Sequence, residues 1–242
     1  MISYIKYYFI LTLMKLDIIE KKYLLIRKLG EGNFGKVFLA KNTNTDNYVA
    51  IKIEKSKTPL LKYEARIYTL LKNINCVPKL RSFGKHDEFY YMVIDYLPIS
   101  IKDRLIERGG KLHINEVYYI AKQLIECLKC IHQCKLIHRD IKPENIMLKD
   151  NKIKTNVYLI DFGLCTISKK KKDKNLQNII GTLNYVSINV HNGYTPSFMD
   201  DLESLGYVLI YLHNGYLPWE SENSETKYYM KREIHKNEIN EK

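Results

Sequence analysis

The apolar pattern of the chain changes near residue 98, and this change limits the possible folds more than any other feature. Before it, short aliphatic and aromatic runs between turn residues predict strands, with one helical pattern among them. After it, apolar residues recur mainly at helical spacing. Strands are predicted at 23–29, 36–40, 48–53, 80–83 and 89–94, short strands or loops near 136–138, 146–148 and 157–160, and helices at 60–71, 115–132 and 200–212. We therefore expect an α+β fold with a small antiparallel β-sheet lobe that carries one helix, followed by a mainly α-helical lobe.

The size and charge of the chain narrow its possible partners. Its 242 residues suffice for one large domain or two small ones. Lys and Arg number 39 against 27 Asp and Glu, a formal net charge of +12. Such a charge indicates an anionic partner: nucleotide phosphates, nucleic acid, an acidic protein or a membrane surface. The sequence has no helix-turn-helix, zinc-finger or RNA-binding signature, so specific nucleic-acid binding is not expected.

The five cysteines are an odd number in a chain of this size, which favours free thiols in a reducing compartment, the cytoplasm or the nucleus. Cys127, Cys130 and Cys134 lie close together with His132 between the last two. A zinc site is one interpretation, but no second ligand pair follows at a suitable spacing. The spacing of three and four residues equally fits one face of a helix.

The first 14 residues, MISYIKYYFILTLM, contain an apolar run that begins at Tyr7. This run is far shorter than the roughly 20 residues that cross a bilayer, and no small-residue cleavage site follows it. We expect a flexible or misassigned extension over residues 1–22, with Met14 as an alternative start. A membrane-surface anchor is the weaker alternative. No other segment is apolar enough to be a transmembrane segment.

A glycine-rich turn, GEGNFGKV at 30–37, lies between two predicted strands. In a dinucleotide-binding fold such glycines lead into a helix. Between two strands, they instead suit a flap whose backbone N–H groups lie over phosphates. Lys52 ends the apolar run VAIK in the next strand, which favours a phosphate ligand, and Glu64 on the following helix is the candidate carboxylate that holds it.

The segment HRDIKPEN at 138–145 is the strongest single signal for chemistry. Asp140 is placed to accept the proton of an attacking hydroxyl, and Lys142 to neutralise a transferring phosphoryl group. Asn145 and the later Asp161, which begins the tripeptide DFG, are the candidate ligands of Mg²⁺.

Together, in this order and spacing, these motifs resemble the eukaryotic protein kinase superfamily from about residue 23 onward. The resemblance implies a bilobal protein-kinase-like fold, ATP and Mg²⁺ as cofactors, and protein substrates. Lys142 is typical of Ser/Thr kinases, and Ile94 falls at the gatekeeper position. The residues implied to bind the nucleotide are Leu29, Gly30, Gly32, Gly35, Val37, Ala50, Lys52, Ile94, Asp95, Leu97 and Met147.

Three later segments are similar to the casein kinase I group: GTLNYVSINVH at 181–191, DDLESLGY at 200–207, and LPW at 217–219. This similarity implies that Thr182 orients Asp140 and that Asp201 braces the catalytic loop. That group commonly has basic residues in place of Asn184 and of Phe198 with Met199, which help it bind acidic or phosphorylated substrates. The run of four lysines at 169–172 is a candidate replacement, although a solvated, mobile loop is the favoured interpretation.

The resemblance is expected to stop soon after Trp219. The expected domains are an extension over 1–22, a kinase N-lobe over 23–94, a hinge over 95–98, a partial C-lobe over 99–219 and a charged tail over 220–242. A shortened C-lobe would leave apolar surface on the helix at 200–212, which invites a partner that covers it. The leading hypothesis is an active Ser/Thr kinase of casein kinase I type acting on proteins, with acidic ones as candidates. The alternative is a catalytically impaired scaffold or decoy that binds nucleotide and partner proteins.

Overall fold

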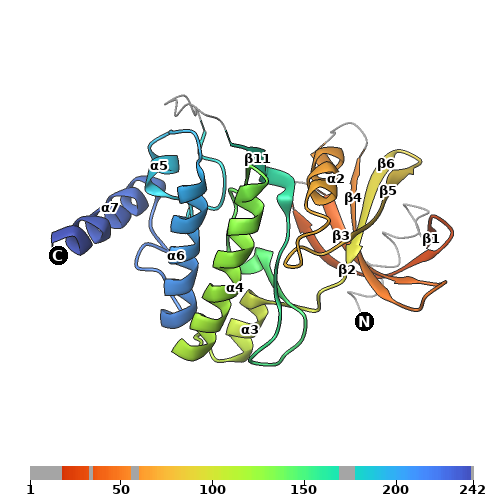
Figure 1. Ribbon diagram of the computed structural model, residues 1–242, viewed down its shortest axis with the longest axis horizontal. Coiled ribbons are helices and arrows are strands. Elements are labelled where there is room, and N and C mark those ends of the chain that lie inside the picture. Colours follow the sequence, from red (N-terminus) through yellow and green to blue (C-terminus); the bar gives the residue numbers. More distant parts are fainter. Residues whose placement is uncertain (1–17, 33–34, 56–59, 169–177, 241–242) are drawn as a thin grey trace. The chain divides into compact units, whose positions relative to one another are not determined.

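The computed structural model describes residues 18–32, 35–55, 60–168 and 178–240, and side chains as far as residue 234. The chain divides into two compact units (Figure 1). Unit 1 holds the residues up to Asn73 together with Val77–Leu97, and unit 2 holds Ile74–Cys76 together with Pro98–Lys242. One unit is an antiparallel sheet with a helix and the other is mainly helical, so the predicted α+β fold is confirmed.

Unit 1 is built on one antiparallel sheet. Its strands, within the described residues, are β1 (Ile18–Ile19), β2 (Tyr23–Gly32), β3 (Gly35–Asn42), β4 (Tyr48–Lys55), β5 (Leu80–His86) and β6 (Phe89–Asp95), in the order β1-β2-β3-β4-β6-β5. Helix α2 (Leu60–Leu70) packs against β4, β5 and β6. Because strand side chains alternate between the faces, Phe38, Ile51 and Val93 lie together on one face, where they form a buried apolar core with Tyr23 and Ile19.

The end of the expected N-terminal extension belongs to this sheet. Ile19 on β1 is fully buried, and the carboxylate of Glu20 accepts hydrogen bonds from Ser82 and Tyr91. Residues 18–22 are therefore part of the folded unit rather than a flexible extension. Met14 and the proposed membrane-surface anchor lie outside the described residues. Among the residues that are described, no helix combines the length and the apolar character needed to cross a membrane.

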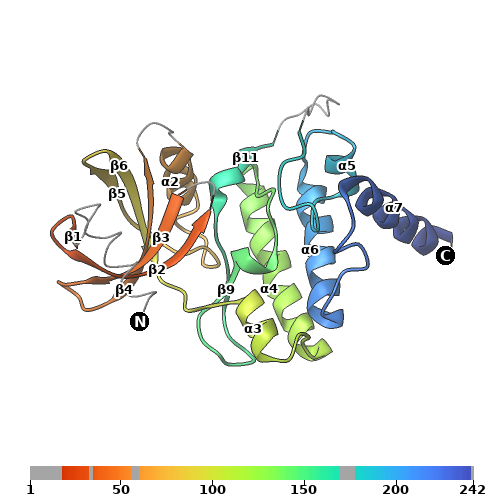
Figure 2. The same cartoon turned by 180° about the vertical axis from the view of Figure 1, so that it is seen from behind.

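Unit 2 is organised around two long antiparallel helices, α4 (Ile114–Gln133) and α6 (Phe198–Asn214), which lie side by side in Figures 1 and 2. Around them lie β7 (Ile99–Ser100), α3 (Ile101–Glu107), β8 (Leu136–Ile137), η1 (Pro143–Asn145), β9 (Ile146–Leu148), β10 (Val157–Leu159), η2 (Phe162–Leu164), β11 (Thr166–Ile167), α5 (Ile188–His191) and α7 (Ser224–Asn240). The elements of this set that were not predicted are β7, α3, η1, η2, β11, α5 and α7. Ser100 starts α3 with a capping box, and Gly215 ends α6 in the left-handed conformation.

The segment from residue 220, expected to be a charged tail, contains a helix that packs on the rest of unit 2. Its residues from Ser224 onward form α7, and two of its lysines, Lys227 and Lys231, are 5% and 0% exposed. Alternating charges usually indicate a solvated surface. Here the long lysine side chains instead reach inward, and their ammonium groups bind backbone carbonyl groups.

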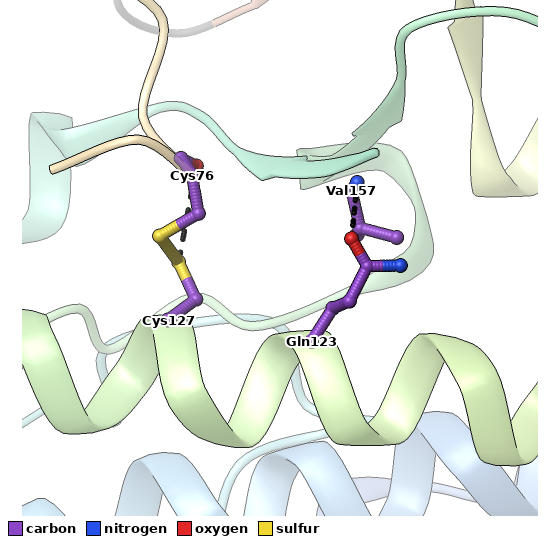
Figure 3. Close-up of a disulfide and its surroundings, with 4 residues drawn as sticks. All are labelled: Cys76, Gln123, Cys127 and Val157. Atoms are coloured by element: carbon purple, nitrogen blue, oxygen red, sulfur yellow. Dashed lines mark hydrogen bonds between the residues drawn. A yellow bond between two sulfur atoms is a disulfide. The ribbon is translucent and has the colours of Figure 1, made fainter. Parts of the chain in front are cut away.

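The expectation of free thiols is wrong for one pair of cysteines. Cys76 and Cys127 form a disulfide with their Cα atoms 5.8 Å apart (Figure 3). Cys127 lies on the buried face of α4, and the backbone of Cys76 is held next to it because Leu159 N donates to Cys76 O at 2.9 Å. The two cysteines are 51 residues apart, so no local spacing indicates the pair. Cys130, Cys134 and Cys165 are free thiols.

Candidate active site

The predicted nucleotide-binding residues of unit 1 follow from the sheet register. Val37 lies between Gly30 and Lys52 on the neighbouring strands, and Ala50 pairs with Ile94. Because directly opposed residues share a face, Val37, Ala50, Lys52 and Ile94 lie together on the face opposite the apolar core. The sheet thus brings residues from three strands to one surface.

Gly35 begins β3 with φ at +119°, a conformation that favours glycine. A Cβ atom at this position would collide with the carbonyl oxygen of Ile53 on β4. The turn therefore needs glycine here for backbone packing. Gly32 pairs with Gly35 across the turn, and the two residues between them, 33 and 34, lie outside the described residues.

Lys52 and Glu64 are brought together within unit 1. Nζ of Lys52 donates to Oε2 of Glu64 at 2.7 Å, and the two side chains are 13% and 3% exposed. Glu64 is on the buried face of α2, beside Leu61 and Ala65, so packing of the helix on the sheet sets the position of the carboxylate. An ion pair this little exposed is screened weakly by salt, and its geometry holds the lysine ammonium at a defined place.

The remaining nucleotide-binding candidates of unit 1 are Leu29 within β2, Asp95 at the end of β6, and Leu97 just beyond it. Leu29 is 36% exposed on β2, and Leu97 is the last residue of the unit. The carboxylate of Asp95 accepts from Nε of Arg81 at 2.6 Å and from the backbone N–H of Lys79 at 3.1 Å. Through these bonds the Asp95 carboxylate connects the end of β6 to the start of β5.

The carboxylate of Asp140 is held by several donors of unit 2. Lys142 donates from Nζ to Oδ2 at 2.6 Å, and Thr182 donates from Oγ1 to Oδ1 at 2.7 Å. Asn145 donates from Nδ2 to the backbone oxygen of Asp140 at 2.9 Å and to Oδ2 at 3.2 Å. A carboxylate bound in this way, and 7% exposed, has a fixed orientation. It can accept a proton from a hydroxyl placed against it.

The backbone that carries Asp140 is braced by Asp201 of α6. Asp201 accepts the N–H of His138 at Oδ2 and the N–H of Arg139 at Oδ1, both at 2.9 Å. Arg139 adopts a left-handed conformation, φ +71°, which is strained for a residue with a side chain. The two bonds from a carboxylate that is 1% exposed stabilise this strained turn and thereby direct Asp140.

Thr182 reaches Asp140 because the preceding residue is glycine. Gly181 has φ at +109°, and a Cβ there would lie 2.5 Å from the backbone oxygen of Arg139. The chain can approach the catalytic loop this closely only without a side chain. Thr182 also accepts a hydrogen bond from Lys142 Nζ at 3.3 Å, so the three polar groups form one network.

The proposed metal ligands lie at the open end of the β9–β10 hairpin. Ile146 pairs with Leu159, and Ile160 N donates to Asn145 O at 3.0 Å, so Asp161 is the residue that follows the one opposite Asn145. Since the amide nitrogen of Asn145 binds Asp140, its amide oxygen points the other way. Amide and carboxylate oxygens are ligands that Mg²⁺ prefers, so these residues fit the predicted metal. Met147 lies on β9 between Ser100 and Tyr158.

His132 has a role that the sequence did not indicate. Its Nε2 lies 2.8 Å from Oδ2 of Asp201, so it joins the brace of the catalytic loop. Over the residues that the structure describes, no group of three or more His, Cys, Asp or Glu side chains is arranged to hold a metal ion. The zinc interpretation of this cysteine-rich stretch therefore has no support. His132 lies in the last turn of α4, shortly before residues 138–145, and this position is the sequence signal for its contact with Asp201.

A comparison with family models matches residues 23–241 to the protein kinase domain. The match includes α7 and so corrects the expectation that the resemblance stops after Trp219. It accords with the order of the elements described above: glycine-rich turn, Lys52, Glu64, catalytic loop and Asp161. The chain belongs to the protein kinase domain family.

Proposed function

We propose that this chain is an active Ser/Thr protein kinase of casein kinase I type, which transfers the γ-phosphoryl group of ATP to hydroxyl groups of proteins. The observation that carries the proposal is the carboxylate of Asp140, held by Lys142, Thr182 and Asn145 at 2.6 to 3.2 Å. This arrangement suits a reaction in which positioning and electrostatics supply most of the catalysis.

Asp140 and Lys142 have complementary roles in the proposed transfer. The substrate hydroxyl oxygen forms a bond to the γ-phosphorus, the bond from that phosphorus to the bridging oxygen of ADP breaks, and Asp140 accepts the hydroxyl proton. Lys142, whose ammonium group lies 2.6 Å from Asp140 Oδ2, offsets negative charge on the transferring group. Thr182 keeps the carboxylate turned toward the hydroxyl.

Unit 1 supplies the residues that hold the nucleotide in this proposal. Lys52, kept in place by Glu64, binds the α- and β-phosphates, and the glycine-rich turn covers them. Val37, Ala50 and Ile94, which share one face of the sheet, contact the adenine in this proposal. Asn145 and Asp161 would hold Mg²⁺, which supplies positive charge to the phosphates when bound.

Two observations favour the Ser/Thr and casein kinase I assignments. Lys142 stands two residues after Asp140 and bonds to both Asp140 and Thr182, as the resemblance to Ser/Thr kinases implies. Ser187, of the segment Ser-Ile-Asn, donates to Asp200 Oδ1 at 2.6 Å and caps α5 by accepting from Val190 N at 3.1 Å. The segment therefore anchors to α6 through a serine hydroxyl.

The test is transfer of radiolabelled phosphate from ATP with Mg²⁺, using casein as an acidic protein substrate, followed by analysis of the phosphorylated amino acids. We expect label on serine or threonine with the wild-type chain and none with Lys52→Met. Absence of transfer by a folded chain that binds ATP would contradict the proposal. Label on tyrosine would contradict its Ser/Thr part.

A further inference from the structure

Lys231 extends from α7 to the backbone of the segment 183–186. Its Nζ donates to the carbonyl oxygen of Leu183 at 2.9 Å and to that of Val186 at 2.7 Å. The side chain is fully buried, and the ammonium group lies over the rings of Tyr207 and Trp219, 4.8 and 5.4 Å from their centroids. Aromatic faces and carbonyl oxygens are favourable partners for a desolvated cation.

Lys227, one turn earlier on α7, makes a second connection. Its Nζ donates to Oδ1 of Asn184 at 2.7 Å, and also to the carbonyl oxygens of Trp219 at 2.8 Å and Glu220 at 2.7 Å. The indole N–H of Trp219 donates to the backbone oxygen of Asn184 at 2.9 Å. Hydrogen bonds to three of its residues, Leu183, Asn184 and Val186, thus tie the segment 183–186 to α7 and to the turn before α7.

The same segment begins at the catalytic carboxylate. Thr182, which bonds to Asp140, directly precedes Leu183, and the N–H groups of Tyr185 and Val186 donate to the carbonyl oxygen of Thr182 at 2.8 and 3.0 Å. The side chain of Leu183 is 37% exposed. A protein that brings a hydroxyl to Asp140 therefore meets Thr182 and Leu183, whose backbone Lys231 holds.

We propose that Lys231, supported by Lys227, is a positioning residue for the protein substrate: it fixes the segment 182–186 so that a substrate hydroxyl is presented to Asp140. This inference rests on the proposed kinase function. The lysines act through the loop and touch neither ATP nor the phosphoryl group. Their loss should therefore weaken use of the protein substrate and leave binding of the nucleotide unchanged.

Lys231→Met tests the proposal because methionine has a similar length and no donor. The matched control is Arg232→Met, which changes an exposed residue of the same helix. For Lys231→Met we expect at least a tenfold fall in kcat/KM for casein, carried mainly by KM for casein. The dissociation constant of MgATP, measured by titration calorimetry, should stay within twofold of wild type. Arg232→Met should match wild type in both.

Amide hydrogen exchange supplies a readout that does not depend on activity. In Lys231→Met we expect faster exchange at Tyr185 and Val186, with unchanged exchange in the middle of α4. A merely structural role would instead raise exchange throughout and reduce MgATP binding, which would overturn the proposal. So would unchanged kcat/KM for casein or unchanged exchange at these two amides.

Two further controls complete the design. If Lys231→Met does not fold, Lys227→Met tests the proposal instead, because this variant leaves both hydrogen bonds of Lys231 intact. A rise of at least threefold in KM for casein would support the proposal, and an unchanged KM would overturn it. If the wild-type chain transfers no phosphate, the proposed function fails. The exchange at Tyr185 and Val186 then still tests whether Lys231 holds the loop.

Discussion

The catalytic loop and α7 use lysine in opposite ways. Lys142 pairs with the carboxylate of Asp140, and its side chain keeps 23% exposure. Lys231 is fully buried and binds neutral carbonyl oxygens and aromatic rings. Burial lowers the pKa of Lys231 to about 7, and the repulsion from Lys227 adds to this effect. The lysine beside a carboxylate forms an ion pair, whereas the one buried among dipoles keeps its hydrogen bonds and holds its charge weakly.

The two lysines differ in whether their contacts require a positive charge. A neutral amine still has two N–H donors, and Lys231 uses two carbonyl acceptors, so its clamp does not require the positive charge. In the proposed transfer, Lys142 offsets the charge of a phosphoryl group, which a neutral amine cannot do. The predictions below test this contrast from the largest expected effect to the smallest.

Asp140→Asn should have the largest effect. The amide has similar shape but cannot accept the hydroxyl proton, so kcat for casein should fall by a factor on the order of 10³ or more. Binding of MgATP should remain within twofold of wild type by titration calorimetry. A variant that transfers phosphate as fast as wild type would remove Asp140 from the proposed role.

Lys142→Met removes the partly buried ammonium group that pairs with Asp140. We expect kcat to fall about a hundredfold, equivalent to about 2.7 kcal/mol of transition-state stabilisation. KM for casein should change little, which separates this lysine from Lys231. A change confined to KM would show that the two lysines have the same role and would remove the contrast between them.

Lys231 should make stability depend on pH. Because its folded pKa lies below the unfolded value of 10.5, the unfolded chain binds one more proton between about pH 7 and 10.5, and stability rises with pH there. From pH 7.5 to 8.5 this contributes about 1.2 kcal/mol. Denaturant unfolding should show that increment in wild type and Arg232→Met, and not in Lys231→Met.

Burial sets the direction of this effect, and the charged neighbours of Lys231 modify its size. Glu203 on α6 raises its pKa, Lys227 on α7 lowers it, and His191 on α5 has a pKa lowered to about 4 by burial and by the charge of Lys231. His191 remains neutral from pH 7.5 to 8.5, so it does not contribute there. Equal slopes for wild type and Lys231→Met over this interval would contradict the low pKa of Lys231.

Thr182→Val should have the smallest effect of the series. Valine keeps the shape but removes the hydrogen bond to Asp140 Oδ1, while Lys142 and Asn145 still hold the carboxylate. We expect kcat to fall about five- to tenfold, in line with about 1 kcal/mol for one hydrogen bond. Thr182→Ser, which retains the hydroxyl, should recover most of the rate; equal loss in both variants would assign the effect to packing instead.

The sequence predicted the parts whose signal is local. Strands β2 to β6 of unit 1, the long helices α4 and α6, and the ordered motifs from the glycine-rich turn to Asp161 all have short-range patterns of period or spacing. The sequence did not indicate α7 packing or the Cys76–Cys127 pair. Lys231 binds backbone carbonyls, which leave no mark on residue identity, and the disulfide joins positions 51 residues apart. Contacts of this kind follow only from the tertiary fold.

The disulfide also changes the topology of the chain. Cys76 and Cys127 close a covalent ring that contains the Leu97–Pro98 bond, where the chain passes from unit 1 to unit 2. A protease that cuts once within this ring leaves a single disulfide-linked molecule, heavier by one water, which separates into two fragments only after reduction. The linker of the oxidised chain can therefore be severed without dividing the protein.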